Sequence, residues 1–470
     1  MNLAINTYID FIHTIFMPIF SLFPINLLAF LLVTDLSLRN VIYANVLNRQ
    51  NSQISAVLHL SDLHFDPRYH PTTSTLNRTN GHPFNCHPSE KLVQKGLPMS
   101  GPFGGEYSCD SPKLLIEFTL SEVHRIVPSP QMIVFTGDSG PHGAEYSLEE
   151  VLSIVGEVSK MLKAQFSTVP VIPALGNHDF PNSQMPDEFH PFYKRVFGLW
   201  HSLDWLDNAQ FETFSRGGYY TRQISGITFI VLNTNIYYSE NNVTYSNQAD
   251  PLGQFAFLDE QLEEAQRRNS FVNIVGHIAA GYKDKKDYKG SMRDEYAEKL
   301  AIKFAHFAQW IRWLFFGHRH KDTFRVIKDP ATGQALLTMF LSPSINTYKQ
   351  KNFPAFRVFE YNSSSNWQFV DIKTYSVNLT RLNARPPPDT RFSPEYSMRD
   401  AYALRDLSPR SMDAFVERMK ADENLFAKYF RFYSVQWHND VPATNSTEKK
   451  IHLCALNNVF MSEYKKCILQ

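Results

Sequence analysis

Five short apolar segments of the sequence each end at residues that can bind a metal ion. The candidate ligands are two aspartates, one asparagine and four histidines: Asp62, His64, Asp138, Asn177, His277, His318 and His320. A strand that ends in Asp, Asn or His is how an open α/β sheet presents polar groups at the carboxyl edge of its strands. Seven nitrogen and oxygen ligands are too many for one four-coordinate ion and suit two. The pattern therefore predicts a two-metal hydrolase.

The individual motifs differ in how specific they are. Asp62-Leu63-His64 and Gly137-Asp138 are common when found alone. Gly176-Asn177-His178-Asp179 is more specific, because Asn is a poor metal ligand and needs a reason to precede His at a strand end. Gly317-His318-Arg319-His320 is specific too, since two imidazoles two residues apart share one face of an extended chain. An isolated histidine is usually a core or surface side chain, so the joint occurrence of these motifs carries the prediction.

In this order the motifs resemble those of the calcineurin-like metallophosphoesterase superfamily: DxH, GD, GNH[ED], GH and GHxH. Within it, the sequence is most similar to the acid sphingomyelinase-like phosphodiesterases. Residues 137–142 resemble the GDxxxH of that family, and residues 276–281 resemble its GHIPPG with both prolines replaced by alanine. The segment from Cys86 to Pro112 and the C-terminal cysteine pair are also similar. The likeness covers about residues 55–470.

The resemblance implies a role for each motif residue. One metal ion would be bound by Asp62, His64, Asp138 and His320, and a second by Asp138, Asn177, His277 and His318. Asp138 would bridge two zinc ions, and imidazole-rich sites do favour zinc, with iron and manganese as alternatives. Two ions about 3.5–4 Å apart can share a water and lower its pKa. His142 and His178 would stabilise phosphoryl oxygens and protonate the leaving oxygen, since imidazole titrates near working pH. Asp179 either orients His178 or is a carboxylate of the turn.

The elements that must position these residues alternate between strand and helix. Apolar residues at helical spacing predict helices at 113–127 and 148–166, the second opened by the capping-box pattern Ser147-x-x-Glu150. Strands before and after each helix predict a largely parallel sheet. A hairpin is expected at 219–233 around Ser225-Gly226. Further helices are expected at 255–268, 294–311, 398–407, 411–422, 425–435 and 453–466. Strands at 324–327, 335–341, 356–361 and 367–377 are expected to form a meander on a second sheet.

The resemblance implies an α/β fold, a four-layer αββα metallophosphoesterase sandwich with a C-terminal helical subdomain. Residues 55–385 would form the catalytic domain and residues 386–470 the helical subdomain, with a boundary at Pro386-Pro387-Pro388. Residues 1–44 would be a signal peptide or an anchor, because Phe11 to Thr34 contains no charged residue. If the segment is not cleaved, it would retain the protein at a membrane.

Cysteines and glycosylation sequons favour a secreted or lysosomal protein. The four cysteines form two local pairs, Cys86 with Cys109 and Cys454 with Cys467, which we interpret as disulfides, with free thiols as the alternative. Five sequons indicate a glycoprotein: Asn77, Asn242, Asn362, Asn378 and Asn445. Lys+Arg and Asp+Glu both number 46, and this balance argues against binding of a nucleic-acid duplex.

The predicted reaction is hydrolysis of a phosphodiester or pyrophosphate bond outside the cytosol. The first hypothesis is a zinc-dependent phosphodiesterase acting on nucleotide-type or related soluble substrates. The alternative is sphingomyelin cleavage to phosphocholine and ceramide, although the residues before Asp62 offer too few cysteines for a saposin-like lipid-extracting domain. A non-catalytic surface glycoprotein is an alternative of another class. The aromatic residues of 412–433 are interpreted as packing on the catalytic domain, with peripheral membrane contact as the alternative. The lysine-rich loop 282–289 is interpreted as solvated, with a substrate phosphate contact as the alternative.

Overall fold

The computed structural model describes residues 54–71, 86–87, 100–104, 109–143, 145–284, 288–348, 352–363, 367–384, 390–436 and 446–470. Residues 1–44, for which a signal peptide or anchor is expected, lie outside this part of the chain, as do the sequons at Asn77 and Asn445. Residues 285–287, at the centre of the lysine-rich loop 282–289, also lie outside the described residues. Residues Ser55–Gln470 cluster as one unit, and the description below concerns that unit.

The first sheet begins as three parallel strands joined by helices. Strands β1 (Ile54–Leu60), β2 (Met132–Phe135) and β3 (Val171–Pro173) alternate with helices α3 (Lys113–Ile126) and α4 (Leu148–Gln165). In register, Val57 lies opposite Met132 and Ile133 opposite Val171. The capping box at Ser147 and Glu150 is present. Three antiparallel strands complete the order β12-β11-β10-β1-β2-β3: β10 (Ala355–Asn362), β11 (Gln368–Ser376) and β12 (Ser393–Ser397).

The second sheet has the order β4-β5-β6-β7-β9-β8. Its strands are β4 (Tyr220–Ile224), β5 (Ile227–Val231), β6 (Val272–Val275), β7 (Ile311–Phe316), β8 (Thr323–Lys328) and β9 (Ala335–Leu341). The expected hairpin joins β4 to β5, and Ser225 and Gly226 take φ of 51° and 79°, as a tight hairpin turn of this type requires. Strands β5, β6, β7 and β9 run parallel, because α7 (Gln254–Arg267) and α8 (Asp294–His306) return the chain between β5, β6 and β7.

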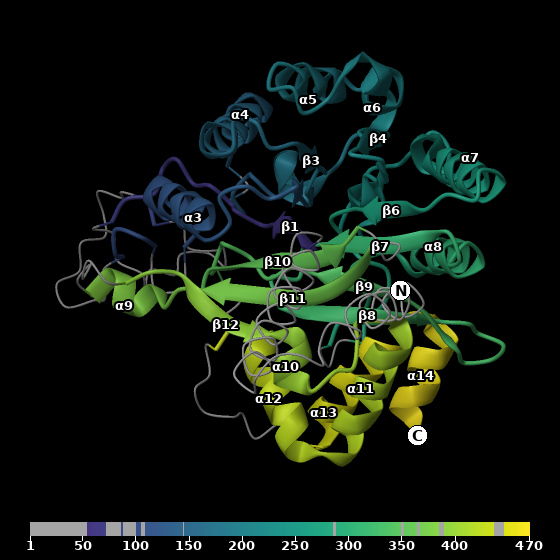
Figure 1. The fold of residues 1–470 in the computed structure, drawn as a ribbon. Helices are drawn as coiled ribbons and strands as arrows, with labels where there is room; N and C mark the ends of the chain where they lie inside the picture. The colour runs from purple at the N-terminus through teal and green to yellow at the C-terminus, as the bar shows by residue number, and fades with distance from the viewer. Residues whose placement is uncertain are drawn as a thin grey trace, which may run out of the picture. The chain divides into compact units, whose positions relative to one another are not determined.

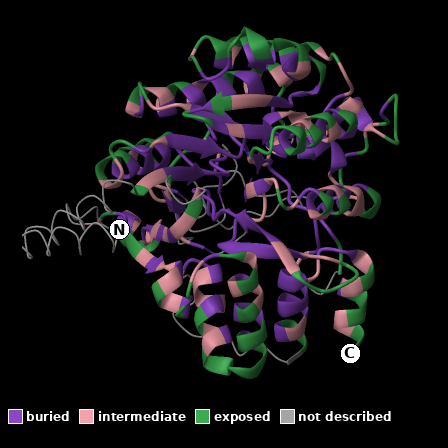
Figure 2. Cartoon of the chain, turned by 45° about the vertical axis from the view of Figure 1, so that its right-hand side comes forward, coloured by how far each residue is buried: buried purple, intermediate pink, exposed green. Residues whose placement is uncertain are grey.

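The two sheets face each other through aromatic side chains. Phe315 of β7 packs on Phe359 of β10 with ring centroids 5.0 Å apart, and Phe340 of β9 lies 5.8 Å from Phe369 of β11. Helices α3 and α4 lie outside one sheet, and α7 and α8 outside the other (Figure 1). Buried residues follow the strands, while the outer faces of the helices are exposed (Figure 2). The αββα sandwich is therefore confirmed.

The C-terminal helices pack on β8 and β9 of the second sheet and, through the first of these helices, on β11 and β12 of the first sheet. They are α10 (Met398–Tyr402), α11 (Pro409–Ala421), α12 (Glu423–Tyr433), α13 (Ser446–Asn457) and α14 (Met461–Leu469), with the short α9 (Leu379–Ala384) before them. Helix α11 contacts β8 and β9, and α13 contacts β8. Met412 and Phe415 are fully buried, and the Phe415 ring lies 6.0 Å from that of Phe324 in β8, so this part of 412–433 packs on the second sheet. Among the described residues, we find no helix with the length and apolarity needed to cross a membrane.

Several expected elements were wrong in extent or placement. The four strands after His320 are not one meander: β8 and β9 extend the second sheet, whereas β10 and β11 cross to the first. The crossing segment is held by hydrogen bonds from Ser342 to Phe316 O and from Asn346 to Asp62 O, which join distant parts of the chain. Apolar alternation predicts a strand but not the sheet edge that it joins.

Helix limits differ for local reasons. The helix expected at 294–311 ends at His306, because the aromatic and β-branched run Ile311–Phe316 forms β7. The helix expected at 453–466 is two helices, α13 and α14, separated after Asn457, where both the backbone N–H and the side chain of Asn458 donate to Cys454 O and close the end of α13. Helices α5 (Pro191–His201) and α6 (Phe211–Gly217) and strand β12 had no expectation from the sequence.

Candidate metal centre

The strand ends of both sheets bring the predicted ligands together. Asp62 and His64 follow β1, Asp138 follows β2, Asn177 follows β3, His277 follows β6, and His318 and His320 follow β7. Backbone hydrogen bonds join the loops: Asp62 N–H donates to Gly137 O at 3.0 Å, and Gly317 N–H to His277 O at 2.9 Å. All seven predicted ligands therefore lie in one cluster.

The backbone of this cluster has an uncommon conformation. Five of the seven residues have φ between 44° and 65°: Asp62, His64, Asp138, His318 and His320. Positive φ is unfavourable for residues other than glycine, and such strain gathers at functional sites. Because the five positions lie on three different loops, the strain is a property of the site and not of one turn.

Four ligands form a first group, Asp62, His64, Asp138 and His320, whose ligand atoms all lie within 4.8 Å of one another. The Nε2 atoms of His64 and His320 are 3.1 Å apart. His320 Nε2 lies 3.1 Å from Asp62 Oδ1, and His64 Nε2 lies 3.4 Å from Asp138 Oδ2. Convergence of two imidazole and two carboxylate groups in a buried space fits one metal ion.

A second group shares Asp138 with the first. Asp138, His277 and His318 meet the same distance limit. His277 Nε2 lies 3.1 Å from Asp138 Oδ2. Asn177 Oδ1 lies 3.0 Å from His277 Nε2 and 2.9 Å from His318 Nδ1, so the asparagine oxygen belongs to this group. The arrangement matches the ligand division that the resemblance implied, with Asp138 between the groups.

Backbone carbonyls orient two of the imidazole rings. His64 Nδ1 lies 2.8 Å from Gly140 O, and His277 Nδ1 lies 2.7 Å from Thr136 O. A carbonyl acceptor places the proton on Nδ1 and leaves the Nε2 lone pair for a metal ion. The residues present therefore fit a pair of divalent ions.

The histidines of the cluster stabilise the ionised form of its two aspartates. Burial raises the pKa of Asp62 and of Asp138, but the neighbouring histidines, led by His320 and His277 respectively, lower both pKa values far below the usual range. Burial and the charge of Asp138 raise the pKa of Asp179 to about 6. Asp62 and Asp138 are thus the anionic members of the site.

Asp179 holds two ligand loops in register. Its carboxylate accepts N–H bonds from Gly176 at 2.7 Å, Ser139 at 2.7 Å and Asp138 at 3.2 Å. These bonds join the loop after β2 to the loop after β3. These bonds support the interpretation of Asp179 as a turn carboxylate. It binds the backbone of two loops and not of one turn alone.

The candidate acids His142 and His178 lie at the more exposed side of the cluster. The His142 ring stacks on His64 with centroids 3.9 Å apart, and lies 4.5 Å from the His178 ring. The side chain of His142 is 20% exposed, whereas that of His64 is fully buried. Burial and the neighbouring His64 lower the pKa of His142 well below its usual value, and burial and His142 do the same to His178.

One residue of this site, Asp110, was missed by sequence reasoning. Asp110 Oδ1 lies 2.7 Å from His142 Nδ1, and Asp110 Oδ2 accepts the backbone N–H of His142 at 2.7 Å. Asn346 donates to Oδ1 at 3.1 Å, and the Asp110 side chain is 1% exposed. The contact spans 32 residues, so no spacing could have paired the two; its position directly after Cys109 was the only signal.

Both expected disulfides are present. Cys86 and Cys109 have Cα atoms 5.6 Å apart, and Cys454 and Cys467 have Cα atoms 5.7 Å apart. The first disulfide ends immediately before Asp110 and thus ties that carboxylate to the loop at Cys86. The two alanines that depart from GHIPPG, Ala279 and Ala280, are 8% and 2% exposed and so form little of the surface beside His277.

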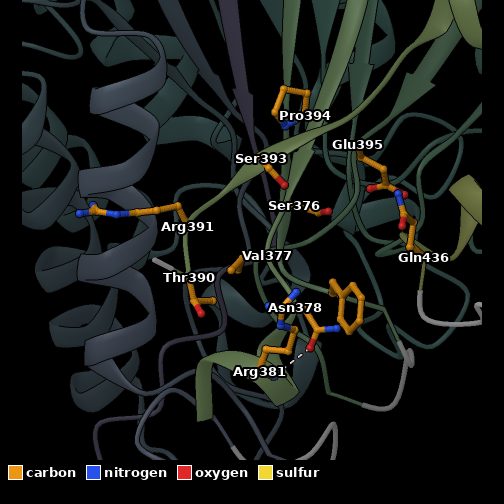
Figure 3. A pocket seen from close by; sticks show the side chains of 11 residues that line it. Ser376, Val377, Asn378, Arg381, Thr390, Arg391, Ser393, Pro394, Glu395 and Gln436 are labelled. Carbon is orange, nitrogen blue, oxygen red and sulfur yellow. Dashed lines mark hydrogen bonds between the residues drawn. The ribbon is translucent and has the colours of Figure 1, made fainter. Parts of the chain in front are cut away.

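Three sequons lie in the described residues, at Asn242, Asn362 and Asn378; Asn242 is exposed and the other two are half-buried. Asn378 lines a polar hollow of about 500 Å³ beside β11 and β12, with Ser376 and Ser393 among its neighbours (Figure 3). Its Oδ1 accepts the backbone N–H of Arg381 at 2.9 Å at the start of α9. Glycosylation of these asparagines stays a prediction.

Comparison with known proteins gives matches along nearly all of the described unit. Residues 55–322 match the calcineurin-like phosphoesterase family, and residues 335–470 match the acid sphingomyelin phosphodiesterase C-terminal region. Acid sphingomyelinase-like phosphodiesterase 3b from Homo sapiens is 33% identical over 87% of this chain and 89% of its own length. Cyclic GMP-AMP phosphodiesterase SMPDL3A from Homo sapiens is 31% identical over 88% of this chain and 89% of its own length. Sphingomyelin phosphodiesterase A from Dictyostelium discoideum is 28% identical over 89% of this chain and 68% of its own length.

Proposed function

Since the chain belongs to the acid sphingomyelinase-like phosphodiesterases of the calcineurin-like phosphoesterase family, we propose that it is a two-zinc phosphodiesterase acting on nucleotide-type soluble substrates. The observation that carries the proposal is the meeting of two ligand groups at one carboxylate, Asp138. Glycosylation and a secreted or lysosomal location are part of the same proposal, and two disulfides support it.

The ligand residues divide between two ions. One ion would be held by Asp62, His64 and His320. The other would be held by Asn177, His277 and His318. Asp138 would bind both ions. Bound there, the ions supply Lewis-acid charge for phosphoryl oxygens and lower the pKa of water at the site. The protein supplies the geometry: carbonyls fix the His64 and His277 rings, and Asp179 fixes the loops around Asp138 and Asn177.

His142 and His178 act on the substrate in this proposal. Their rings lie beside His64 at the more exposed side of the cluster, where a phosphodiester can approach. Because Asp110 accepts from His142 Nδ1, the proton stays on Nδ1 and Nε2 faces the reaction. Because burial and neighbouring imidazoles lower the pKa of both rings, their protonated form is the minor one and a strong acid, which donates to a phosphoryl oxygen and gives its proton to the leaving oxygen. Asp110 acts through His142 as a positioning residue.

The comparisons support a nucleotide-type substrate. The relative named for cyclic GMP-AMP hydrolysis is 31% identical and aligns over 89% of its own length, whereas two relatives named as sphingomyelinases are 30% and 28% identical and align over 83% and 68% of theirs. The proposed substrate is therefore a soluble phosphodiester or pyrophosphate of a nucleoside. Sphingomyelin is the second candidate, because relatives named for it match 78% and 89% of this chain and residues 335–470 match the acid sphingomyelin phosphodiesterase C-terminal region.

Competition between the two substrate classes tests the proposal. The glycosylated protein is incubated with equimolar sphingomyelin micelles and a nucleotide diphosphate ester, with and without a chelator. We expect nucleoside monophosphate to be the main product, and we expect the chelator to abolish it and zinc to restore it. The Asp138→Asn variant serves as the control for a contaminating hydrolase. Dominant phosphocholine release would replace the nucleotide assignment with sphingomyelin, and release of neither product would favour a binding protein without activity.

A further inference from the structure

A buried ion pair connects the two loops that carry the second group of histidines. Arg319 lies between His318 and His320 in the loop after β7, and its Nη2 donates to Asp284 Oδ1 at 2.7 Å. Asp284 lies in the segment that continues from His277 after β6. The side chain of Asp284 is 1% exposed and that of Arg319 is 13% exposed. The pair thus links the two loops within the protein interior.

Helices α12 and α13 enclose this ion pair. His452 of α13 has its Nε2 3.9 Å from Asp284 Oδ2 and 3.2 Å from the Tyr429 hydroxyl of α12. The loop after β7 is also fixed directly, because Asp322 N–H donates to Tyr433 O at 3.2 Å. The C-terminal helices therefore contact both the carboxylate of the pair and the loop that carries its guanidinium.

A second set of contacts holds the segment before Asp284. The ring of Tyr282 stacks on Tyr464 of α14 with centroids 4.2 Å apart and an interplanar angle of 9°. The hydroxyl of Tyr464 donates to Lys283 O at 3.4 Å. The disulfide Cys454–Cys467 joins α13 to α14 near both contacts, and so fixes the helices that hold this segment.

Positive charges around Asp284 keep its carboxylate ionised, so that it forms a true ion pair with Arg319. Burial raises the pKa of Asp284, but Arg319, His452 and Arg325 lower it below its usual range, so the carboxylate is ionised. A buried charge that loses its partner is strongly destabilising, and the planar guanidinium fixes the direction of its hydrogen bonds. Apolar packing alone would leave more freedom to the loop than this pair does.

We propose that the Asp284–Arg319 ion pair is a positioning device that fixes His277 relative to His318 and His320, and that the C-terminal helices act on the metal centre through it. The inference rests on the proposed two-metal function. Both neighbours of Arg319 have left-handed backbone, with φ of 65° and 54°. An anchored side chain between two such residues keeps the loop in a conformation that it would otherwise leave.

Zinc affinity of the full chain tests this positioning role without a substrate. We measure zinc binding by competition with a chromophoric chelator for the wild type, Asp284→Asn, Arg319→Gln and the double variant. Loss of a group that orients metal ligands typically costs 10–100-fold in affinity, so we expect a loss of about that size in each single variant. Because the two residues act as one pair, the double variant should lose about as much as either single variant. Arg319→Lys keeps the charge and should recover part of the affinity.

Lys328→Gln is the matched control. Lys328 of β8 pairs with Asp413 of α11 at 2.6 Å, so it also joins the second sheet to the C-terminal helices but touches neither ligand loop. This variant should keep wild-type zinc affinity. Unchanged affinity in both single variants, or losses that add in the double variant, would overturn the inference. If Asp284→Asn does not fold, Arg319→Lys decides: reduced affinity supports the pair, and wild-type affinity overturns it. A wild type that binds no zinc contradicts the proposed function itself.

Discussion

Replacing Asp110 with Asn tests whether His142 is held for catalysis by a buried carboxylate. Asp110 accepts three hydrogen bonds, two of them from His142 at 2.7 Å. An asparagine at this position keeps one acceptor oxygen, and its NH2 group would face a donor. The imidazole would then have to change tautomer or rotate, while the metal ligands keep their own contacts.

The expected size of the effect follows from the bond that is lost. A hydrogen bond to a charged group contributes about 1.5–3 kcal/mol. At 1.36 kcal/mol for each factor of ten, kcat should fall by about 10- to 160-fold. KM and zinc content should stay close to wild type, because no predicted metal ligand bonds to Asp110 in the described structure. Steady-state kinetics with a nucleotide diphosphate ester, together with metal analysis, measures all three quantities.

Two comparisons make the result decisive. Asp66→Asn is the matched control, since Asp66 is also buried and lies 2.8 Å from a histidine, His87, outside the ligand cluster. It should change stability but leave kcat near wild type. In a His142→Asn background, Asp110→Asn should have little further effect, because the residue acts through His142. A kcat within about threefold of wild type for Asp110→Asn, or equal losses in Asp66→Asn, would refute this reasoning.

Asp138→Asn should lower zinc content below two ions per chain and lower kcat by about 10³-fold, because metal-derived charge contributes several kcal/mol; elemental analysis that still finds two ions would contradict the bridging role. The double variant Cys454→Ala/Cys467→Ala should lose about 3 kcal/mol of unfolding free energy, the entropy of a loop of this length, in denaturant titrations; an unchanged midpoint would contradict it. Glu122→Gln should lose about 1.5–3 kcal/mol at pH 7, since the buried Glu122 side chain accepts from Arg125, Arg391 and Phe392 N–H. Burial raises the pKa of Glu122 but the two arginines lower it below its usual value, so the stabilisation is present above about pH 4.3 and lost as pH falls. The difference between wild type and Glu122→Gln should therefore shrink in acid unfolding experiments, and a constant difference from pH 7 to 3 would contradict the assignment.

The fold was predictable where local signals were strong. The helix opened by Ser147 and the hairpin at Ser225-Gly226 depend on contacts within a few residues, and both are confirmed. The placement of β10 and β11 was not predictable, because the choice of sheet depends on the long connection through Asn346 to Asp62. Strand β12 was missed because Pro394 lies within it, and a proline is disfavoured inside a strand except at a sheet edge, where β12 lies.

For the candidate site, the sequence by itself determined which residues come together. Each candidate ligand lies directly after an apolar strand, and parallel strands present their carboxyl ends at one edge, so order and residue type were enough to name all seven residues of the cluster. The tertiary structure decided how they are held. Asp110 reaches His142 across 32 residues, and Asp284 reaches Arg319 across 35. Contacts of this kind depend on the packing of loops and C-terminal helices onto the sheets, for which the spacing of residues along the chain carries no signal.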